Sequence, residues 1–226
     1  MSGSGRDAVL KIVTERGIQE VLHFTTNLGF VGCLATKAVL PRNRLKKEQF
    51  LQHILTLNAP FRAEEEDWFD QTEKWIDYVN LSISAISANL FRSSSLRWHA
   101  AASFSWVIMS FDPALMADEG VYFSTTNNIY PLTTRASGAR GLEALFAPSV
   151  PRKPGWAAYR GARAAHLPTC EQAEVLYPKM LPIRYLRRLY VADGEDSDWA
   201  HCILSQYGRL DVQVVVNRTK FAGNPN

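Results

Sequence analysis

The sequence predicts an α+β fold in one domain, with a mostly antiparallel sheet and flanking helices. Its 226 residues suit one domain with a full core, and 46% hydrophobic with 21% charged residues is ordinary globular composition. Short β-prone runs are separated by polar or Asp-Pro turns, which favours antiparallel strands. Helical spacing of apolar residues near both ends of the chain predicts the helices. We therefore treat residues 1–226 as a single domain.

The first forty residues predict a helix, a strand and a second helix. Apolar residues with helical spacing over Val9–Val13 indicate the first helix, and Gly17 ends it. The run 21–25 then predicts a buried strand. Asn27 is the expected cap of a helix that stops before Pro41. A strand therefore runs directly into a helix.

The rest of the chain alternates short strands, short helices and one long excursion. The excursion is rich in Gly, Pro, Ala and Arg with weak periodicity, a composition typical of long segments that are functional or disordered. The predicted segments are a helix at 45–57, strands at 78–83, 106–111 and 120–124, an excursion over 125–168 with a helix at 142–146, a strand at 173–177, a helix at 183–188, a strand at 189–191, a helix at 199–207 and a strand at 212–216.

Composition excludes several classes of protein. No apolar run approaches the roughly 20 residues that cross a bilayer, so we expect a soluble protein without a membrane partner. Residues 1–5 lack the features of a signal peptide and are expected to be a disordered start or an added linker, which favours the cytoplasm. The net charge of +3 is too small by itself to indicate nucleic acid. One segment is locally basic, because six cations against one acid lie between Arg135 and Arg163.

The common catalytic motifs are also absent. There is no glycine-rich dinucleotide fingerprint and no phosphate-binding loop, and the five histidines and three cysteines lack the spacing of a metal site. We therefore expect no metal. The serines lack the setting of a nucleophile elbow.

Three features need more than a structural explanation. His23 lies inside an apolar strand, where its ring must find hydrogen-bond partners. Ser82 and Ser84 share one face of a predicted strand by the period of two. Glu174 places a carboxylate in an apolar strand immediately after the basic excursion. Taken alone, His23 is commonly a core histidine, and Glu174 is commonly on the solvent side of an edge strand.

These residues resemble the DarT family of DNA ADP-ribosyltransferase toxins. Three segments in the same order carry the resemblance, and the glutamate segment is the most specific of them. The segments are Leu22-His23-Phe24-Thr25 followed by a helix, Tyr78-Val79-Asn80-Leu81-Ser82-Ile83-Ser84, and Glu171-Gln172-Ala173-Glu174-Val175-Leu176 followed by Leu181-Pro182. The resemblance covers about residues 18–193 and implies a split mixed sheet with an NAD cleft between its halves.

The resemblance also implies roles for single residues. Glu174 matches the catalytic glutamate, and His23 matches a histidine on the adenosine side of NAD, with Phe24 and Thr25 beside it. Ser82 would lie under the nicotinamide ribose. The arginine that holds the NAD diphosphate is assigned to Arg62, in preference to Arg42 and Arg44. NAD is the implied co-substrate.

The excursion over 135–169 would then recognise the acceptor. Its cations can neutralise phosphates, and its aromatic rings can stack on unpaired bases, so we expect single-stranded DNA. The residues assigned to nucleic acid are Arg152, Lys153, Trp156, Tyr159, Arg160, Arg163 and His166. One branch of the family has a thymine-deprotonating histidine where this chain has 125–128, without histidine, which leaves guanine open.

Two alternatives remain. The acceptor could be RNA or protein, because nothing in the excursion encodes DNA directly. The chain could also be a nucleic-acid-binding module without catalysis. The resemblance further implies a toxin whose antitoxin removes ADP-ribose or blocks the cleft.

Overall fold

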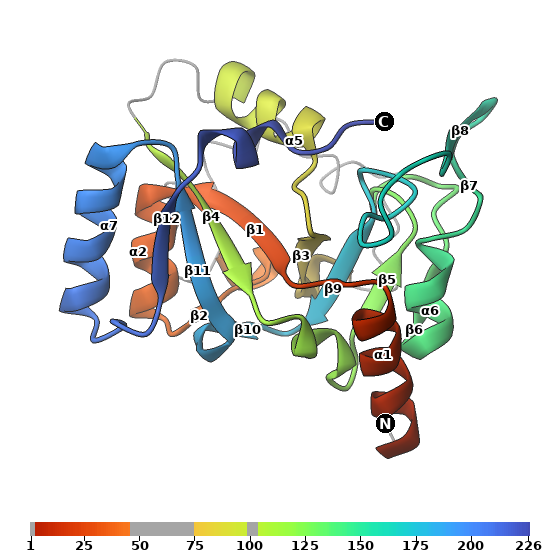
Figure 1. Ribbon diagram of the computed structural model, residues 1–226, viewed down its shortest axis with the longest axis horizontal. Helices are drawn as coiled ribbons and strands as arrows, with labels where there is room; N and C mark the ends of the chain where they lie inside the picture. The colour runs from red at the N-terminus through yellow and green to blue at the C-terminus, as the bar shows by residue number, and fades with distance from the viewer. Residues whose placement is uncertain (1–2, 46–74, 99–103) are drawn as a thin grey trace.

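A computed structural model of the protein describes residues 3–45, 75–98 and 104–226. It has one large mixed sheet with helices around it (Figure 1). The order of the eight strands is β12-β11-β4-β1-β3-β9-β5-β6. Their bounds are β1 (Val21–Thr26), β3 (Tyr78–Ile83), β4 (Trp106–Phe111), β5 (Tyr122–Ser124), β6 (Arg135–Ser137), β9 (Glu174–Pro178), β11 (Leu186–Val191) and β12 (Gln213–Val216). Among the described strands of this sheet, β11 and β12 pair in parallel and the other pairs are antiparallel, so the predicted mixed, mostly antiparallel α+β fold is confirmed.

The large sheet is split between β1 and β3. These strands pair at two positions, Val21 opposite Ile83 and Leu22 opposite Ser82. On its other side, β1 pairs with β4 along all six of its residues. The backbone of β1 therefore parts from β3 at His23. The sheet consists of two halves that diverge from this point, as Figure 1 shows.

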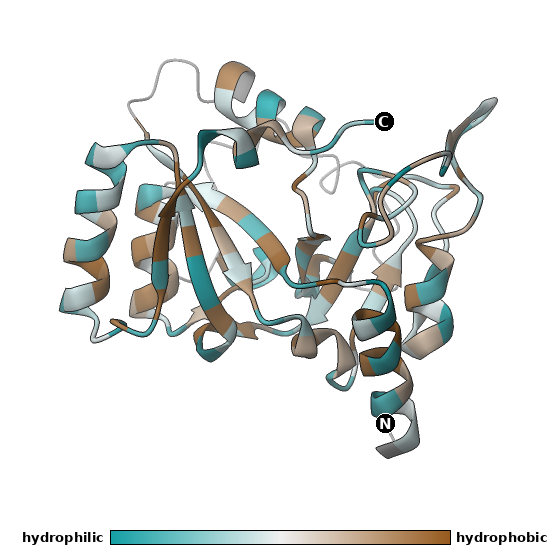
Figure 2. Cartoon of the chain, in the orientation of Figure 1, coloured by the Kyte–Doolittle hydropathy of each residue, from teal (hydrophilic) through white to brown (hydrophobic). Residues whose placement is uncertain are grey.

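Helices cover both halves. The α-helices are α1 (Gly3–Glu15), α2 (Asn27–Ala35), α3 (Arg42–Leu45), α5 (Ala88–Arg92), α6 (Gly138–Ala144) and α7 (Gly194–Gln206). Helices α2 and α7 flank the half with β4, β1 and β11, whereas α1 packs against α6 at the other half (Figure 1). In Figure 2 hydrophobic and hydrophilic bands succeed one another along the central strands and along α7, as expected for elements with one buried side.

The remaining elements are short. They are the strand pair β2 (Ala38–Val39) with β10 (Leu181–Pro182), the hairpin β7 (Ser149–Lys153) with β8 (Trp156–Tyr159), the 3-10 turns η4 (Trp75–Asp77), η6 (Pro113–Ala117), η7 (Ile183–Tyr185) and η8 (Arg218–Ala222), and the π-helical turn η5 (Ser93–Trp98). The hairpin projects from one edge of the molecule (Figure 1).

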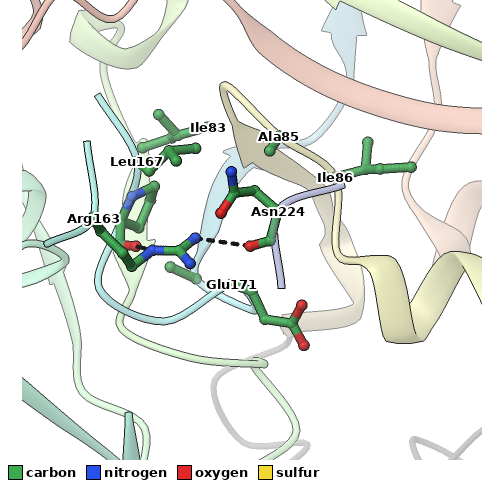
Figure 3. A pocket seen from close by; sticks show the side chains of 9 residues that line it. Ile83, Ala85, Ile86, Arg163, Leu167, Glu171 and Asn224 are labelled. Carbon is green, nitrogen blue, oxygen red and sulfur yellow. Dashed lines mark hydrogen bonds between the residues drawn. The ribbon is translucent and has the colours of Figure 1, made fainter. Parts of the chain in front are cut away.

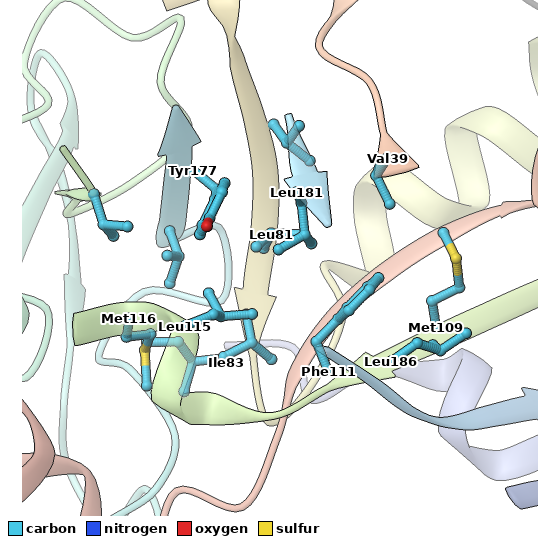
Figure 4. Packing of buried hydrophobic residues seen from close by; sticks show 14 of the residues in the cluster. Val39, Leu81, Ile83, Met109, Phe111, Leu115, Met116, Tyr177, Leu181 and Leu186 are labelled. Atoms are coloured by element: carbon cyan, nitrogen blue, oxygen red, sulfur yellow. The ribbon is translucent and has the colours of Figure 1, made fainter. Parts of the chain in front are cut away.

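One hydrophobic core joins the two halves on the face opposite the site described below. Phe111 of β4, Leu81 and Ile83 of β3, and Leu115 and Met116 of η6 belong to the same buried cluster (Figure 4). Each of these side chains is at most 2% exposed. Truncating a buried phenylalanine such as Phe111 to alanine costs about 3–5 kcal/mol of stability. This core keeps the sheet in one piece although the β1–β3 ladder is short.

A buried polar network ties the end of the chain to the start of β1. The carboxylate of Glu20 accepts hydrogen bonds from Ser110 Oγ at 2.7 Å, from Tyr190 Oη at 2.8 Å and from Lys220 Nζ. Lys220 also donates to the carbonyl of Ser84, whose φ of 62° lies in the left-handed region. Burial acts to raise the pKa of Glu20, but these donors together hold it below its usual value.

The structure corrects three local predictions. Residues Gly3–Gly5, predicted to be disordered, form the first turn of α1. The helix predicted at 183–188 is only the η7 turn, because β11 begins at Leu186 and pairs with β4 and β12. The cap of α2 is Thr26, whose hydroxyl accepts from Gly29 N at 3.1 Å, and Asn27 is the first helical residue. The helix predicted at 45–57 falls mainly outside the described residues.

Candidate functional site

Glu174 lies at the centre of a polar row on one face of the sheet. It is the first residue of β9 and only 8% exposed. It pairs with Ser124 of β5 on one side. On the other side Leu81 of β3 pairs with Val175, so the next residue of β3, Ser82, lies opposite Glu174. Directly opposite residues of antiparallel strands point to the same face, so Ser82, Glu174 and Ser124 lie side by side. The sheet thus brings together two residues predicted from the sequence, Ser82 and Glu174.

The carboxylate of Glu174 is held in place by the loop that follows β5. Its Oε2 accepts a hydrogen bond from the main-chain N–H of Asn128 at 2.8 Å. Asn128 is buried and is itself bound by Arg135, which donates from Nε to Oδ1 at 2.5 Å and from Nη2 to the carbonyl oxygen. A hydrogen bond to an ionised carboxylate is short and strong. The orientation of Glu174 is therefore set before any ligand binds.

His23 occupies the point where the sheet splits. Its Nδ1 lies 3.0 Å from the carbonyl oxygen of Asn80 on β3. A carbonyl can only accept, so Nδ1 carries the proton in this contact. Burial lowers the pKa of His23, while the bond to Asn80 acts in the opposite direction. The ring is therefore neutral near pH 7, with Nε2 as a hydrogen-bond acceptor.

Phe24 and Thr25, the two residues after His23, lie on opposite faces of β1. Phe24 packs edge-on against Phe91 of α5, with ring centroids 5.3 Å apart, and lies 6.0 Å from Trp106. These contacts indicate a packing role for Phe24, on the face opposite to His23 by strand alternation. Thr25 alternates to the same face as His23 and is half-buried.

The arginine assigned to the NAD diphosphate is not part of the described structure. Arg62 lies in the segment 46–74, outside the described residues. Its alternatives Arg42 and Arg44 belong to α3, which Asn43 links to η4 through a 2.5 Å hydrogen bond to Asp77. Arg44 contacts the sulfur of Met180 at 3.6 Å.

The excursion over 135–169 is more ordered than its composition predicts. It contains β6, α6 and the β7–β8 hairpin. In the hairpin, Trp156 and Tyr159 are 49% and 72% exposed, and Lys153 is exposed beside the ring of Tyr130. Arg152 is instead buried, with its guanidinium 4.0 Å from the centre of the Trp156 ring. The hairpin therefore presents aromatic surface and a cation to solvent.

Two arginines of the excursion bind the protein itself. Arg160 donates to the carbonyls of Ala164 and Leu167, both at 3.0 Å. Arg163 donates to the carbonyl of Pro168 at 2.9 Å and to that of Asn224 at 3.0 Å (Figure 3). Both arginines therefore hold main-chain carbonyls of the excursion and of the C-terminus, and their contact with nucleic acid stays a prediction. His166 is exposed.

The C-terminal residues lie against the segment that leads into Glu174. The side chain of Asn226 accepts from Glu171 N at 3.0 Å and donates to the carbonyl of Thr169 at 2.5 Å. A small cavity of about 10 Å³ lies here, lined in part by Arg163, Glu171 and Asn224 (Figure 3). It has room for about one water molecule. Contacts with the C-terminal residues thus hold the segment before Glu174 in place.

Within the described ranges, no group of three His, Cys, Asp or Glu residues could hold a metal ion. The described helices also include none that is long and apolar enough to cross a membrane. The three cysteines are free thiols, of which Cys33 and Cys170 are buried and Cys202 is exposed, and burial raises the pKa of Cys33 to about 12. Cys33 is therefore protonated at neutral pH and unsuited to be a nucleophile.

Comparison with known proteins decides the family. The model of the family described as "ssDNA thymidine ADP-ribosyltransferase, DarT" matches residues 22–222. The chain belongs to the DarT family. It is an NAD-dependent ADP-ribosyltransferase of the kind that modifies single-stranded DNA, which confirms the prediction from the resemblance. No curated protein sequence matches the chain.

Solved DarT structures have the same fold. Thermus sp. 2.9 DarT in complex with NAD+ matches with a TM-score of 0.61 and 13% identity, over 89% of this chain and 96% of that chain. Thermus sp. 2.9 DarT in complex with ADP-ribosylated ssDNA matches with a TM-score of 0.60 and 13% identity, over 90% and 96%. Thermosipho africanus DarTG in complex with ADP-ribose matches with a TM-score of 0.59 and 13% identity, over 90% and 51%.

Two residues of this DarT site have no individual signal in the sequence. Asn128 belongs to a stretch notable only for lacking histidine, and Arg135 is the first of several arginines in a basic segment. Their relation to Glu174 depends on the strand order β9-β5-β6 and on a hydrogen bond between residues 46 positions apart. Strand order is not encoded in any local pattern.

Proposed function

We propose that this DarT uses Glu174 to transfer ADP-ribose from NAD to a base of single-stranded DNA. The observation that carries the proposal is the polar row Ser82–Glu174–Ser124, in which the buried carboxylate is oriented by the main chain of Asn128. A buried carboxylate in a fixed orientation, surrounded by hydroxyl groups, is suited to stabilise charge that develops during a reaction.

The chemistry follows from the charge of the transition state. Cleavage of the bond between nicotinamide and ribose gives the anomeric carbon of ribose an oxocarbenium-like positive charge. Glu174 stabilises this charge by accepting a hydrogen bond from the neighbouring 2-hydroxyl of the ribose. The attacking nitrogen of the DNA base forms a bond to the anomeric carbon, nicotinamide leaves, and the proton of that nitrogen passes to a base, for which Glu174 is the candidate.

NAD would bind along the split between β1 and β3. His23 presents Nε2 as an acceptor there, which matches a ribose hydroxyl or an adenine amino group as donor. On β3, Ser82 lies opposite Leu22, whereas Thr25 lies on the same face of β1 as His23. Arg62 remains the candidate for the diphosphate, because a guanidinium offers two parallel donors to phosphate. Phe24 would support this site by packing rather than by contact.

DNA would contact the exposed face of the hairpin. Trp156 and Tyr159 offer rings for stacking on bases, and Lys153 and His166 offer polar groups to phosphates. Arg152 would keep Trp156 in position through their stacked contact. Arg160 and Arg163 would contribute by holding the loop in shape.

The acceptor base has two candidates. Thymidine is the base in the description of the family. Guanine is the alternative, because residues 125–128 of this chain contain no histidine and place a main-chain N–H beside Glu174. Mass analysis of oligonucleotides that contain only one of the two bases separates these candidates.

We further propose that the protein is the toxin of a toxin–antitoxin pair acting in the cytoplasm, where NAD and DNA are both present. The similarity to a structure titled DarTG supports this proposal. The partner would be an antitoxin that removes ADP-ribose from DNA or covers the site.

The test uses labelled NAD, a single-stranded oligonucleotide and two matched variants. Wild type and Glu195→Gln, an exposed carboxylate on α7, should label the DNA equally. Glu174→Gln should label none while it retains the increase in melting temperature that NAD produces. Full activity of Glu174→Gln would exclude this role. Labelling of RNA or protein in preference to DNA would change the acceptor, and NAD binding without any transfer or hydrolysis by wild type would favour a silent binding module.

A further inference from the structure

We propose that Arg135 is a positioning residue for the reaction, which acts on Glu174 through Asn128. The inference rests on the proposed catalytic role of Glu174 and assigns a function to a residue that the sequence marks only as a cation of the basic segment. It starts from the three-residue chain of contacts Arg135–Asn128–Glu174.

The sheet places Arg135 two strands away from Glu174 on the same face. Ser124 is opposite Glu174 on one side and opposite Arg135 on the other. Neighbouring strands are about 4.8 Å apart, so the two Cα atoms are separated by roughly 10 Å. An arginine side chain is long enough to reach back across Ser124 toward the carboxylate.

Asn128 fills the space between them and is fixed at three of its polar groups. Arg135 binds its side-chain oxygen and its carbonyl oxygen with two nitrogen atoms of one planar guanidinium. The third group, the main-chain N–H, points to Glu174 Oε2 at 2.8 Å. Because the guanidinium is rigid and holds both oxygens, the direction of the N–H is set by Arg135.

The surroundings of Arg135 support the same role. Its guanidinium lies 5.1 Å from the ring centre of Trp75, which is 6% exposed and packs against Tyr78 and Tyr122. A cation stacked on a buried ring is held in one conformation. Hydrogen bonds in such a dry setting are stronger than at the surface. The side chain of Arg135 is thus held between Trp75 and Asn128, next to the site.

Two effects on Glu174 follow. The main-chain N–H of Asn128 keeps one carboxylate oxygen of Glu174 in place. The side chain therefore loses less conformational entropy when the transition state forms. The nearby positive charge and the N–H both favour the ionised carboxylate, which is the form that stabilises an oxocarbenium-like ribose. Loss of Arg135 should therefore slow the chemical step more than it weakens NAD binding.

The experiment compares Arg135→Gln, Arg135→Lys and Asn128→Ala with Arg187→Gln. Arg187 is a matched control on β11, since it also binds a carbonyl, that of Arg184, and an oxygen of Asp112. For each protein we would measure kcat and KM for NAD in transfer to single-stranded DNA and in NAD hydrolysis, and the NAD-induced change in melting temperature.

Arg135→Gln should lower kcat in both reactions by roughly tenfold to a hundredfold, with KM for NAD changed less than about threefold, as is typical for loss of a residue behind a catalytic group. Arg135→Lys should recover only part of kcat, because a single ammonium cannot bind both oxygens of Asn128. Asn128→Ala keeps the N–H and should have an intermediate effect, and Arg187→Gln should match wild type.

An unchanged kcat in Arg135→Gln would overturn the inference while leaving Glu174 in place. Equal losses of kcat and of the NAD-induced melting change would also overturn it, since they indicate a folding or NAD-binding role. If Arg135→Gln does not fold, Asn128→Ala decides, and a wild-type kcat in that variant excludes the proposal. Full activity of Glu174→Gln would instead remove the proposed function itself.

Discussion

Glu20 and Glu174 are both 8% exposed, yet the regions around them differ in kind. Glu20 binds side chains from three distant parts of the chain, Ser110, Tyr190 and Lys220. Glu174 is bound by the main chain of Asn128, in a row with Ser82 and Ser124. Glu20 joins distant segments and so stabilises the fold, whereas Glu174, the proposed catalytic carboxylate, is oriented by a nearby loop. Burial alone does not distinguish these two roles.

Glu174→Gln should have the largest effect on activity and a small one on stability. We expect transfer and NAD hydrolysis to fall by about 10³-fold, the upper range for loss of one group that stabilises transition-state charge. Stopped time courses with labelled NAD measure the rates, and thermal unfolding measures stability. A loss of stability as large as the one expected for Glu20 would contradict the contrast between the two carboxylates.

Glu20→Gln should have the opposite profile. Breaking a buried ion pair while Lys220 stays in place costs about 3 kcal/mol of unfolding free energy. Activity per folded molecule should remain close to wild type. Denaturant unfolding at neutral pH measures the cost, with the double variant Glu20→Gln/Lys220→Gln as a control that removes both charges.

The same network predicts how stability depends on pH. The pKa of Glu20 is lowered in the folded state, so its contribution is complete above the ordinary value of about 4.3 and is lost as pH falls toward the lowered value. The stability difference between wild type and Glu20→Gln should therefore shrink below about pH 4.3. A difference that stays constant down to pH 3 would show that Glu20 is not ionised in the fold.

Tyr159→Ala should separate DNA binding from chemistry. The ring is 72% exposed on the hairpin, and loss of one stacking ring costs about 1–3 kcal/mol of binding to single strands. NAD hydrolysis without DNA should stay unchanged. Fluorescence anisotropy with a labelled oligonucleotide measures the affinity, and Tyr207→Ala, an exposed tyrosine at the end of α7, is the matched control.

His23→Asn should have the smallest effect on stability, confined to mildly acidic pH. Asparagine can donate to the Asn80 carbonyl in place of Nδ1 but does not titrate. Because the pKa of His23 is lowered in the fold, the unfolded chain binds the proton first, and stability is lost as pH falls below about 6.5. Melting curves between pH 7.5 and 5 should fall more steeply for wild type than for the variant; parallel curves would contradict this.

The pattern of apolar residues along the sequence predicts the strands that carry the site, but it does not predict which strands pair with each other. The strands at 21–25, 78–83 and 173–177 were predicted from apolar runs, and each is present within one residue. The helix predicted at 183–188 was wrong because pairing of β11 with two neighbours overrides the helical spacing. The carbonyls that Arg160 and Arg163 bind, such as that of Asn224, become their neighbours only after folding, so no local pattern indicates these contacts.

The sequence by itself determined the family and the α+β class, and it singled out Glu174 as the proposed catalytic carboxylate, since these depend on the order and spacing of residues within single segments. Tertiary structure alone decided which residues surround that carboxylate. Sheet order set Ser124 and Arg135 beside Glu174, and the split between β1 and β3 gave the His23 ring its partner. The physical reason is that hydrogen bonds between distant strands depend on the whole packed core, which no local pattern encodes.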